Sequence, residues 1–227
     1  LTIAPFSGTV PLKSDGLSPY REFVFGEDPR AYDMVINLPK LKTHAMMGLT
    51  LGVKNTFGFI GGLQKGKWHL KAGKDVLLFA SMLIDIHRLV NPAITILDGI
   101  TAMDGDGPTS GRPRQAGLVA AASNAFALDR AVEAFLNLPS PLPISRLALE
   151  HGLIPPFETK GTLPEPLRDF QMPHTLATDW GLPVYLKETL KKFLVKKPKV
   201  KAKGCRGCGV CADICPAGAI QLQDGKP

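Results

Sequence analysis

"KDVLLFASMLIDIHRLVNPAITILDGI", residues 74–100, holds a helical pattern followed directly by a strand pattern. In its first two thirds the apolar side chains recur at the spacing of one helix face, and Pro92 then stops the helix. The residues that follow are dense in β-branched side chains and reach Asp98-Gly99, a common turn signal. The stretch therefore predicts a helix over 74–91 and a buried strand over 93–100.

Two other stretches predict further strands of the same sheet. Met34–Leu38 is a short apolar run ended by Pro39, which suits a buried strand of a parallel sheet. Residues 117–124 predict another strand, and Asn124 can cap a helix predicted over 125–137. The order strand, helix, strand, strand, helix predicts an α/β fold with a mainly parallel sheet flanked by helices.

The other parts of the body show weaker patterns. The first 30 residues are rich in Pro, Gly and Ser and are predicted to be irregular. Residues 43–69 are rich in glycine, and we expect mostly loop there with short helical pieces. Residues 139–182 are rich in proline, and one helix is expected near 144–152.

Composition and charge limit the class of protein. Apolar residues make up 44% and charged residues 21%, as in folded soluble proteins. No apolar run approaches the ~18–20 residues that span a bilayer, and no basic-then-apolar leader is visible. We therefore expect a soluble, cytoplasmic protein without a membrane span.

The net charge of +7 is concentrated in one segment. Residues 187–206 hold nine Lys or Arg and one Glu, a local charge of +8, so 18 basic and 19 acidic residues remain elsewhere. Nucleic-acid binding usually needs basic residues spread over a folded face, so no nucleic-acid partner is expected. A solvated linker is the preferred interpretation, and a docking segment for an acidic redox partner is the alternative.

A basic amphipathic helix is predicted at the start of that segment. Pro183 can open it and Pro198 closes it, with lysines on one face and a small apolar face on the other. We expect the apolar face to pack on the body, with a membrane surface as the alternative. The expected organisation is an α/β body over 1–182, a basic helix and linker over 183–203, and a small segment over 204–227.

All four cysteines lie in "GCRGCGVCADICPAGAI", residues 204–220. The spacing is C-x2-C-x2-C-x3-C-P, the run with which bacterial ferredoxins hold a [4Fe–4S] cluster. Two-residue gaps bring three thiolates to three corners of a cubane, and neighbouring glycines allow the tight loop. Zinc sites usually pair two C-x2-C units across a longer spacer, and disulfides are unusual without export. The predicted ligands are Cys205, Cys208, Cys211 and Cys215, and the predicted cofactor is a [4Fe–4S] cluster.

The cysteine run resembles half of a two-cluster bacterial ferredoxin domain. That resemblance implies that the first three cysteines hold one cluster and that Cys215 reaches toward a second. No second cysteine run follows in this sequence. We expect a chain cut inside its ferredoxin domain, and the alternative is that Cys215 completes a single cluster.

The body also resembles a known family. "DMVINLPKLKTHAMMGLTLGVKNTFGFIGG", beginning at residue 33, and "ILDGITAMDGDGPTSG", beginning at residue 96, are similar to the domain-of-unknown-function family numbered 362. The resemblance covers roughly residues 30–180 and implies an α/β fold with a C-terminal iron–sulfur segment. It implies no reaction, and Asn124 stands where such sequences often have Asp.

Three polar stretches follow the predicted strands and form the candidate site. Ligands of open α/β sheets bind outside the carboxyl ends of the strands, and lysines and imidazoles beside carboxylates can bind an anion and move protons. The stretches around these positions also contain Lys40, Lys65 and Lys67. The predicted substrate-binding residues are Lys42, His44, Lys54, Asn55, His69, Asp98, Asp104 and Asp106.

Other interpretations of these stretches are weaker. "GGLQKGKW", residues 61–68, fits G-x4-G-K, but Trp68 replaces the Ser or Thr that meets magnesium, which argues against a nucleotide phosphate loop. Asp104 and Asp106 are an alternative site for a divalent cation, although only two carboxylates are close in sequence. In the absence of a ligand role, the Gly-Asp loops are ordinary turns and the lysines are solvated.

Two functions are consistent with the sequence. In the first, an enzyme or enzyme component binds a small, anionic substrate in its body and exchanges electrons through the cluster. In the second, a non-catalytic electron carrier or iron–sulfur sensor uses its body to dock a protein partner. The sequence names no catalytic residue, substrate or direction of electron flow, and a redox partner protein is expected in both cases.

Overall fold

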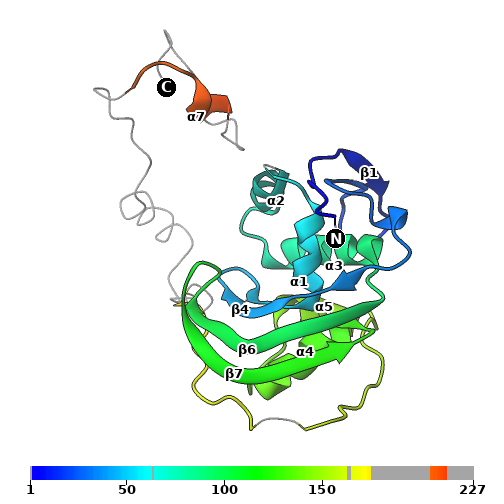
Figure 1. Ribbon diagram of the computed structural model, residues 1–227, viewed down its shortest axis with the longest axis vertical. Coiled ribbons are helices and arrows are strands. Elements are labelled where there is room, and N and C mark those ends of the chain that lie inside the picture. Colours follow the sequence, from blue (N-terminus) through cyan, green and yellow to red (C-terminus); the bar gives the residue numbers. More distant parts are fainter. Residues whose placement is uncertain (1, 63, 163–164, 175–204, 214–227) are drawn as a thin grey trace.

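The computed structural model describes residues 2–62, 64–162, 165–174 and 205–213 (Figure 1). The predicted basic helix after Pro183 and the fourth cysteine, Cys215, lie outside the described residues. No helix among the described residues is long and apolar enough to cross a bilayer.

A mixed sheet forms the centre of the body (Figure 1). Its strands are β3 (Ile36–Asn37), β4 (Lys40–His44), β5 (Gly48–Thr50), β6 (Ile94–Asp106) and β7 (Ser110–Ala122). β3 and β4 both pair in parallel with β6, while β7 pairs antiparallel with the other edge of β6. β5 extends the sheet as an antiparallel neighbour of β4. The predicted α/β class is confirmed, with the parallel pairing at the centre of the sheet.

The long β6–β7 hairpin differs from the prediction. Asp98-Gly99 does not end β6, because a register shift between Gly99 and Thr101 marks a bulge through which the strand continues. β7 likewise begins seven residues before the predicted strand at 117–124. The "DGDGPTSG" run covers the end of β6, the connecting turn at residues 107–109 and the start of β7.

Short elements fill the stretch between β3 and the first long helix. Pro39 interrupts the predicted strand at Met34–Leu38, and the chain then resumes as β4. α1 (Gly52–Asn55) and the 3-10 turn η2 (Thr56–Phe59) come directly after β5. The prediction of mostly loop over residues 43–69 is wrong at its end, where α2 (Gln64–Ala72) forms a helix of nine residues. Packing of Trp68 stabilises this helix, since its ring centroid lies 4.9 Å from that of Tyr20 and 5.0 Å from that of Phe23.

The long helices agree with the predictions. α3 (Val76–Val90) is capped by Asp75, whose Oδ1 accepts from Leu78 N at 2.9 Å. α4 (Ala125–Phe135) is capped by Asn124, whose Oδ1 accepts from Ala127 N at 2.8 Å, so asparagine fills the capping role without a charge. α5 (Pro143–Glu150) follows. The remaining elements are β1 (Val10–Lys13), β2 (Glu22–Phe25), η1 (Pro29–Ala31) and α7 (Val210–Asp213).

The sheet buries one face and exposes much of the other. Leu41, Leu97 and Leu118 pack with Leu128 and Val132 of α4 in one apolar cluster. A second cluster surrounds α3, where Phe79, Met82, Leu83, Ile84 and Ile86 are fully buried. Exposed apolar side chains also occur on the strands or next to them. They are Ile36, Leu38, Ile100 and Val119.

Candidate functional site

Five basic side chains from three elements form a cluster at one end of the sheet. Lys42 and His44 come from β4, Lys54 from α1, and Lys65 and His69 from α2. Lys65 and His69 are four residues apart on α2 and share one helix face. The rings of His44 and His69 are stacked with centroids 6.3 Å apart and planes inclined by 16°. We call these five residues the basic cluster.

His44 is held as a neutral hydrogen-bond donor. Its Nδ1 accepts from the backbone N–H groups of Met46 at 3.2 Å and Met47 at 3.3 Å, so the ring proton resides on Nε2. Burial, together with positive charge at Lys54, His69 and Lys42, lowers the pKa of His44 to about 3. At neutral pH the ring therefore offers an Nε2–H group without a charge.

The environment of Lys54 disfavours its charged form. Burial, together with the neighbouring charges of Lys42 and Lys65, lowers the pKa of Lys54 to about 8. Burial and Lys54 also lower the pKa of His69, whose ring lies 4.4 Å from that of Phe79. Among the described residues, no recorded ion pair involves any of the three lysines of the cluster. A bound anion would supply the missing negative charge.

Asn55 lies beside the cluster and belongs to a polar network. Its Nδ2 donates to Asn37 Oδ1 at 2.8 Å, and Asn37 Nδ2 donates to the carbonyl oxygen of Gly52 at 2.8 Å. Both asparagines line a pocket of about 350 Å³, whose apolar walls include Phe6, Phe59 and Leu38. Asn55 is thus exposed to a space large enough for a small ligand.

The three predicted aspartates make their described contacts with residues outside the basic cluster. The exposed Asp98 pairs with Lys40, with Oδ2 and Nζ 2.7 Å apart. Asp104 is buried and accepts from Gln171 N at 3.3 Å, with Arg112 Nε at 3.7 Å.

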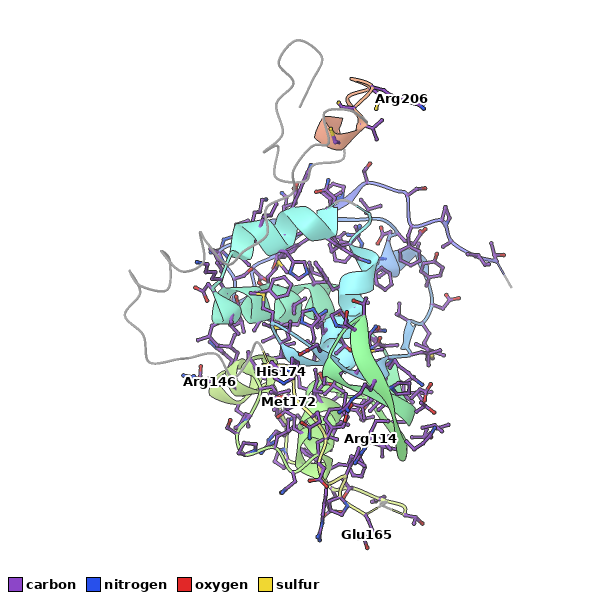
Figure 2. The ribbon with its side chains drawn as sticks, turned by 90° about the vertical axis from the view of Figure 1, so that its left-hand side faces the viewer. Arg114, Arg146, Glu165, Met172, His174 and Arg206 are labelled. Atoms are coloured by element: carbon purple, nitrogen blue, oxygen red, sulfur yellow. The ribbon has the colours of Figure 1, made fainter. Side chains whose placement is uncertain are left out.

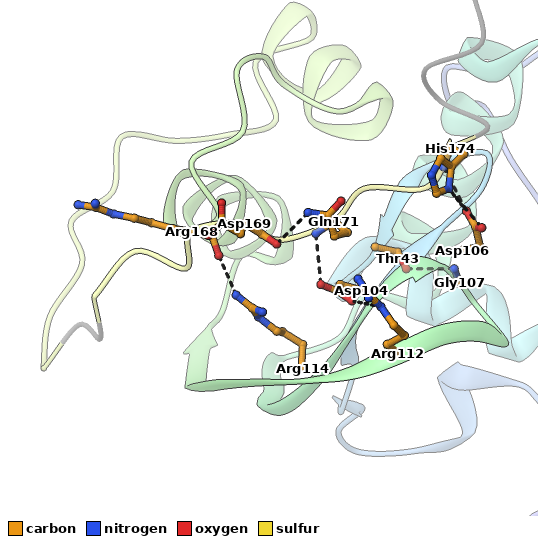
Figure 3. Close-up of polar contacts among 10 residues, drawn as sticks. All are labelled: Thr43, Asp104, Asp106, Gly107, Arg112, Arg114, Arg168, Asp169, Gln171 and His174. Atoms are coloured by element: carbon orange, nitrogen blue, oxygen red, sulfur yellow. Dashed lines mark hydrogen bonds and ion pairs between the residues drawn. The ribbon is translucent and has the colours of Figure 1, made fainter.

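Asp106 and its neighbours anchor a later segment of the chain to the sheet (Figure 3). Asp106 Oδ1 accepts from His174 N at 3.1 Å, and Gly105 N donates to Gln171 O at 2.7 Å. Arg114 holds the same segment through the carbonyl oxygen of Arg168 at 2.9 Å. Residues 168–174, which we call the anchored segment, therefore run along the β6–β7 hairpin.

The anchored segment also reaches the hairpin that carries His44. A Cβ atom on Gly48 would lie 3.3 Å from Met172 Cε, so Met172 lies against the β4–β5 hairpin. Figure 2 shows Met172 and His174 next to each other at the end of the anchored segment. The carboxyl ends of β4 and β6 also meet here, since Gly107 N donates to Thr43 Oγ1 at 3.1 Å. The substrate role of the three aspartates stays a prediction, because their recorded contacts are structural.

The described cysteines fit iron–sulfur chemistry by their donors and their loop. Cys205 is half-buried, Cys208 and Cys211 are exposed, and all three are free thiols. Gly207 and Gly209 have positive φ angles of 67° and 75°, which permit the tight loop between the thiols. Three soft sulfur donors within seven residues match an iron–sulfur ligand set in type and spacing, although the described side chains do not converge into a group that would hold a metal ion.

Comparison with known proteins identifies both parts of the chain. Residues 5–133 match the family described as Domain of unknown function (DUF362), and residues 198–221 match the 4Fe-4S binding domain. This chain belongs to the DUF362 family. The resemblance of the body and of the cysteine run is thereby confirmed.

One curated relative carries the same region. The thylakoid-associated protein sll1697 of Synechocystis sp. is 41% identical over 174 residues, which are 72% of this chain and 53% of the relative. The chain thus spans about half the length of that relative. No solved structure matches the chain.

Two residues of this DUF362 body matter to the site although the sequence did not indicate them. Asn37 and Asp129 are both buried and both bind the backbone of α1. Asp129 sits on a helix whose pattern predicts only an apolar face and a solvated face. No local signal shows that a polar side chain at this position turns inward toward a helix 75 residues earlier.

Proposed function

We propose that this DUF362 protein binds a small anion at the basic cluster of its body and couples that site to a [4Fe–4S] electron-transfer centre. The observation that carries the proposal is the concentration of Lys42, Lys54 and Lys65 beside two neutral histidines, with no carboxylate partner in the part of the chain that the structure describes. The three lysines are partly buried, and clustered cations removed from water are costly unless a ligand compensates their charge.

Each group of the cluster has a distinct task in this proposal. The lysine ammonium groups bind the charge of the anion, and His44 Nε2–H orients one of its oxygens. Because the pKa of Lys54 is about 8, its Nζ can give or take a proton near neutral pH. Lys54 is therefore the candidate proton donor for a substrate that gains electrons.

The iron–sulfur part is proposed to supply the electrons. Cys205, Cys208 and Cys211 would hold the cluster, with Cys215 as the fourth predicted thiolate. Such a cluster, when bound, transfers single electrons. The full cluster type, the substrate and the direction of electron flow belong to this proposal rather than to the family match.

Anion-binding measurements test the proposed site. Calorimetric titration of the anaerobically purified chain with inorganic phosphate, sulfate, citrate and oxaloacetate should reveal saturable binding of at least one anion. Binding should weaken steeply with added salt, because the contacts are electrostatic. Absence of binding by all four anions would contradict the proposed site.

The second candidate is an electron carrier or iron–sulfur sensor that docks a protein partner. The exposed apolar side chains Ile36, Leu38, Ile100 and Val119 favour it, since exposed apolar side chains can belong to an interface. The name of the relative, thylakoid-associated protein, supports a docking role and differs from the cytoplasmic location expected from the sequence.

Charged substitutions on that sheet face separate the two candidates. If Ile100→Lys and Val119→Lys abolish electron delivery to a physiological acceptor while anion binding persists, the sheet face is the partner surface. If electron delivery depends instead on Lys54 and on added anion, the enzyme is the better description.

A further inference from the structure

A buried carboxylate holds the short helix that carries Lys54. Asp129, on α4, is 3% exposed, and its two oxygens accept from Gly52 N at 2.7 Å and from Val53 N at 3.1 Å. These are the first two N–H groups of α1, which have no partner within the helix itself. The carboxyl oxygens of Asp129 thus provide partners for both N–H groups at the start of α1.

α1 depends on such contacts for its position. A helix of four residues has little stability of its own, because the first turn fixes more dihedral angles than its few hydrogen bonds compensate. Asn37 also contacts α1, through the carbonyl oxygen of Gly52 and the side chain of Asn55. The helix is therefore held by a carboxyl group and an amide.

The surroundings of Gly52 show how closely α1 packs against Asp129 of α4. A Cβ atom at this position would lie 3.0 Å from Asp129 Oδ1, 3.0 Å from Thr95 Cγ2 and 3.1 Å from Ala125 Cβ. Only glycine lets the backbone N–H approach the carboxylate without displacing a neighbour. Because Lys54 lies two residues later in the same short helix, this contact also determines the position of Lys54.

We propose that Asp129 is the positioning residue of the anion site: its carboxyl group fixes α1 so that Lys54 lies among the other cations of the basic cluster. The assignment of the site to an anion rests on the proposed function. The positioning of Lys54 by Asp129 is inferred from the contacts of α1 alone. Asp129 touches no part of the basic cluster in its recorded hydrogen bonds, and it acts only through the backbone of α1.

Glu133 provides a matched control. It lies one turn further along α4, is 1% exposed, and accepts from Ser145 Oγ at 2.6 Å and from Arg130 NH1 at 3.3 Å. Burial raises the pKa of Glu133 and also that of Asp129, to about 8 for Asp129. The two acids therefore share helix, burial and chemistry, but only Asp129 binds α1 among the recorded contacts.

The test compares Asp129→Asn with Glu133→Gln in the full chain. Amine labelling of Lys54, followed by mass spectrometry between pH 6 and 11, reports the pKa of that side chain directly. We expect Asp129→Asn to return the labelling of Lys54 toward that of an ordinary lysine, with about a tenfold loss of labelling at pH 7 for each unit by which the pKa rises. Glu133→Gln should label Lys54 as the wild type does.

Phosphate affinity, measured by calorimetry, gives the second readout. Asp129→Asn should weaken phosphate binding about tenfold, and Glu133→Gln should leave it unchanged. If Asp129→Asn folds and alters neither Lys54 labelling nor phosphate affinity, the inference is overturned. If the wild type binds no anion but the labelling still shifts in Asp129→Asn alone, the proposed function fails and the positioning role stands.

A second variant tests the inference if Asp129→Asn does not fold. Gly52→Ala pushes α1 away from the same carboxylate without removing it, and circular dichroism establishes whether the chain is folded. Folded Gly52→Ala should reproduce the shift in Lys54 labelling. Unchanged labelling in this variant would equally overturn the inference.

Discussion

His174 lies with its Nδ1 3.1 Å from Asp106 Oδ1, and its backbone N–H donates to the same oxygen at 3.1 Å. The hydrogen bonds with the side chain and then the backbone of His174 lower the pKa of Asp106. This contact is the last described point at which the body holds the chain before residue 205. An aspartate that the sequence placed in a substrate site is thus engaged in fixing the anchored segment.

Removal of this contact should loosen the anchored segment without unfolding the body. In Asp106→Ala, we expect amide hydrogen exchange at residues 168–174 to increase by no more than about fivefold, since an exposed side-chain contact contributes little to stability. Exchange in α3 should not change. Asp98→Ala is the control, because Asp98 is also an exposed, ion-paired aspartate but contacts Lys40 on the sheet.

Loss of a cluster thiolate should abolish iron binding. Anaerobic preparations of the chain should contain about four irons if Cys215 completes a single cluster, and the absorbance of the cluster should disappear in Cys208→Ser. Iron, zinc and sulfide analysis checks this expectation. A wild-type chain that holds zinc and no sulfide would contradict the iron–sulfur assignment.

Substitution at Cys215 distinguishes the two predicted arrangements. If Cys215 completes one cluster, Cys215→Ser should lower the iron content and change the electron paramagnetic resonance signal. If Cys215 serves a second cluster that needs further cysteines, the wild type should hold substoichiometric or three-iron centres, and Cys215→Ser should resemble it.

Replacement of Lys54 should weaken anion binding more than replacement of an exposed lysine nearby. Charge-assisted hydrogen bonds contribute about 1.5–3 kcal/mol, so Lys54→Met should raise the dissociation constant by roughly tenfold or more. Lys67→Met is the control, because Lys67 lies on α2 but is exposed. Equal losses in the two variants would indicate a diffuse charge effect and argue against a defined site.

The parts of the fold that the sequence predicted well are those with local causes. α3 and α4 follow from apolar periodicity and from the caps Asp75 and Asn124, each of which lies within a few residues of the groups it binds. The cysteine spacing is local in the same way. By contrast, the extension of β6 past Asp98-Gly99 requires pairing with β7 and a bulge, which a turn signal alone does not reveal.

The site was predicted in part for a similar reason. Polar residues after strands drew attention to Lys42, His44, Lys54 and His69, and the structure brings these together because β4, α1 and α2 meet at one end of the sheet. The aspartates came from the same type of signal, yet their recorded partners belong to β4, β7 and the anchored segment. Which polar residue faces a ligand depends on tertiary contacts that motif spacing does not contain.

Stability at acid pH should depend on a buried histidine outside the site. His87 of α3 is 7% exposed, its Nδ1 lies 3.4 Å from Thr56 Oγ1, and burial lowers its pKa to about 4. The unfolded chain binds a proton at this ring below about pH 6.5, while the folded chain stays neutral until about pH 4. The free energy of unfolding should therefore fall as the pH decreases from 6.5 to 4, by roughly 1.4 kcal/mol per pH unit from His87 alone.

Urea unfolding at pH 7 and pH 5 measures this contribution. His87→Gln keeps a group that can bond Thr56 but does not titrate, so it should lose about 2 kcal/mol less than the wild type between these pH values. His151→Gln, at an exposed histidine, should lose as much as the wild type. Because His44 and His69 also have lowered pKa values, the wild type and both variants keep some acid sensitivity, and only the difference at His87 tests the prediction. Equal pH dependence in His87→Gln and the wild type would show that the ring is solvated and protonated in the folded protein.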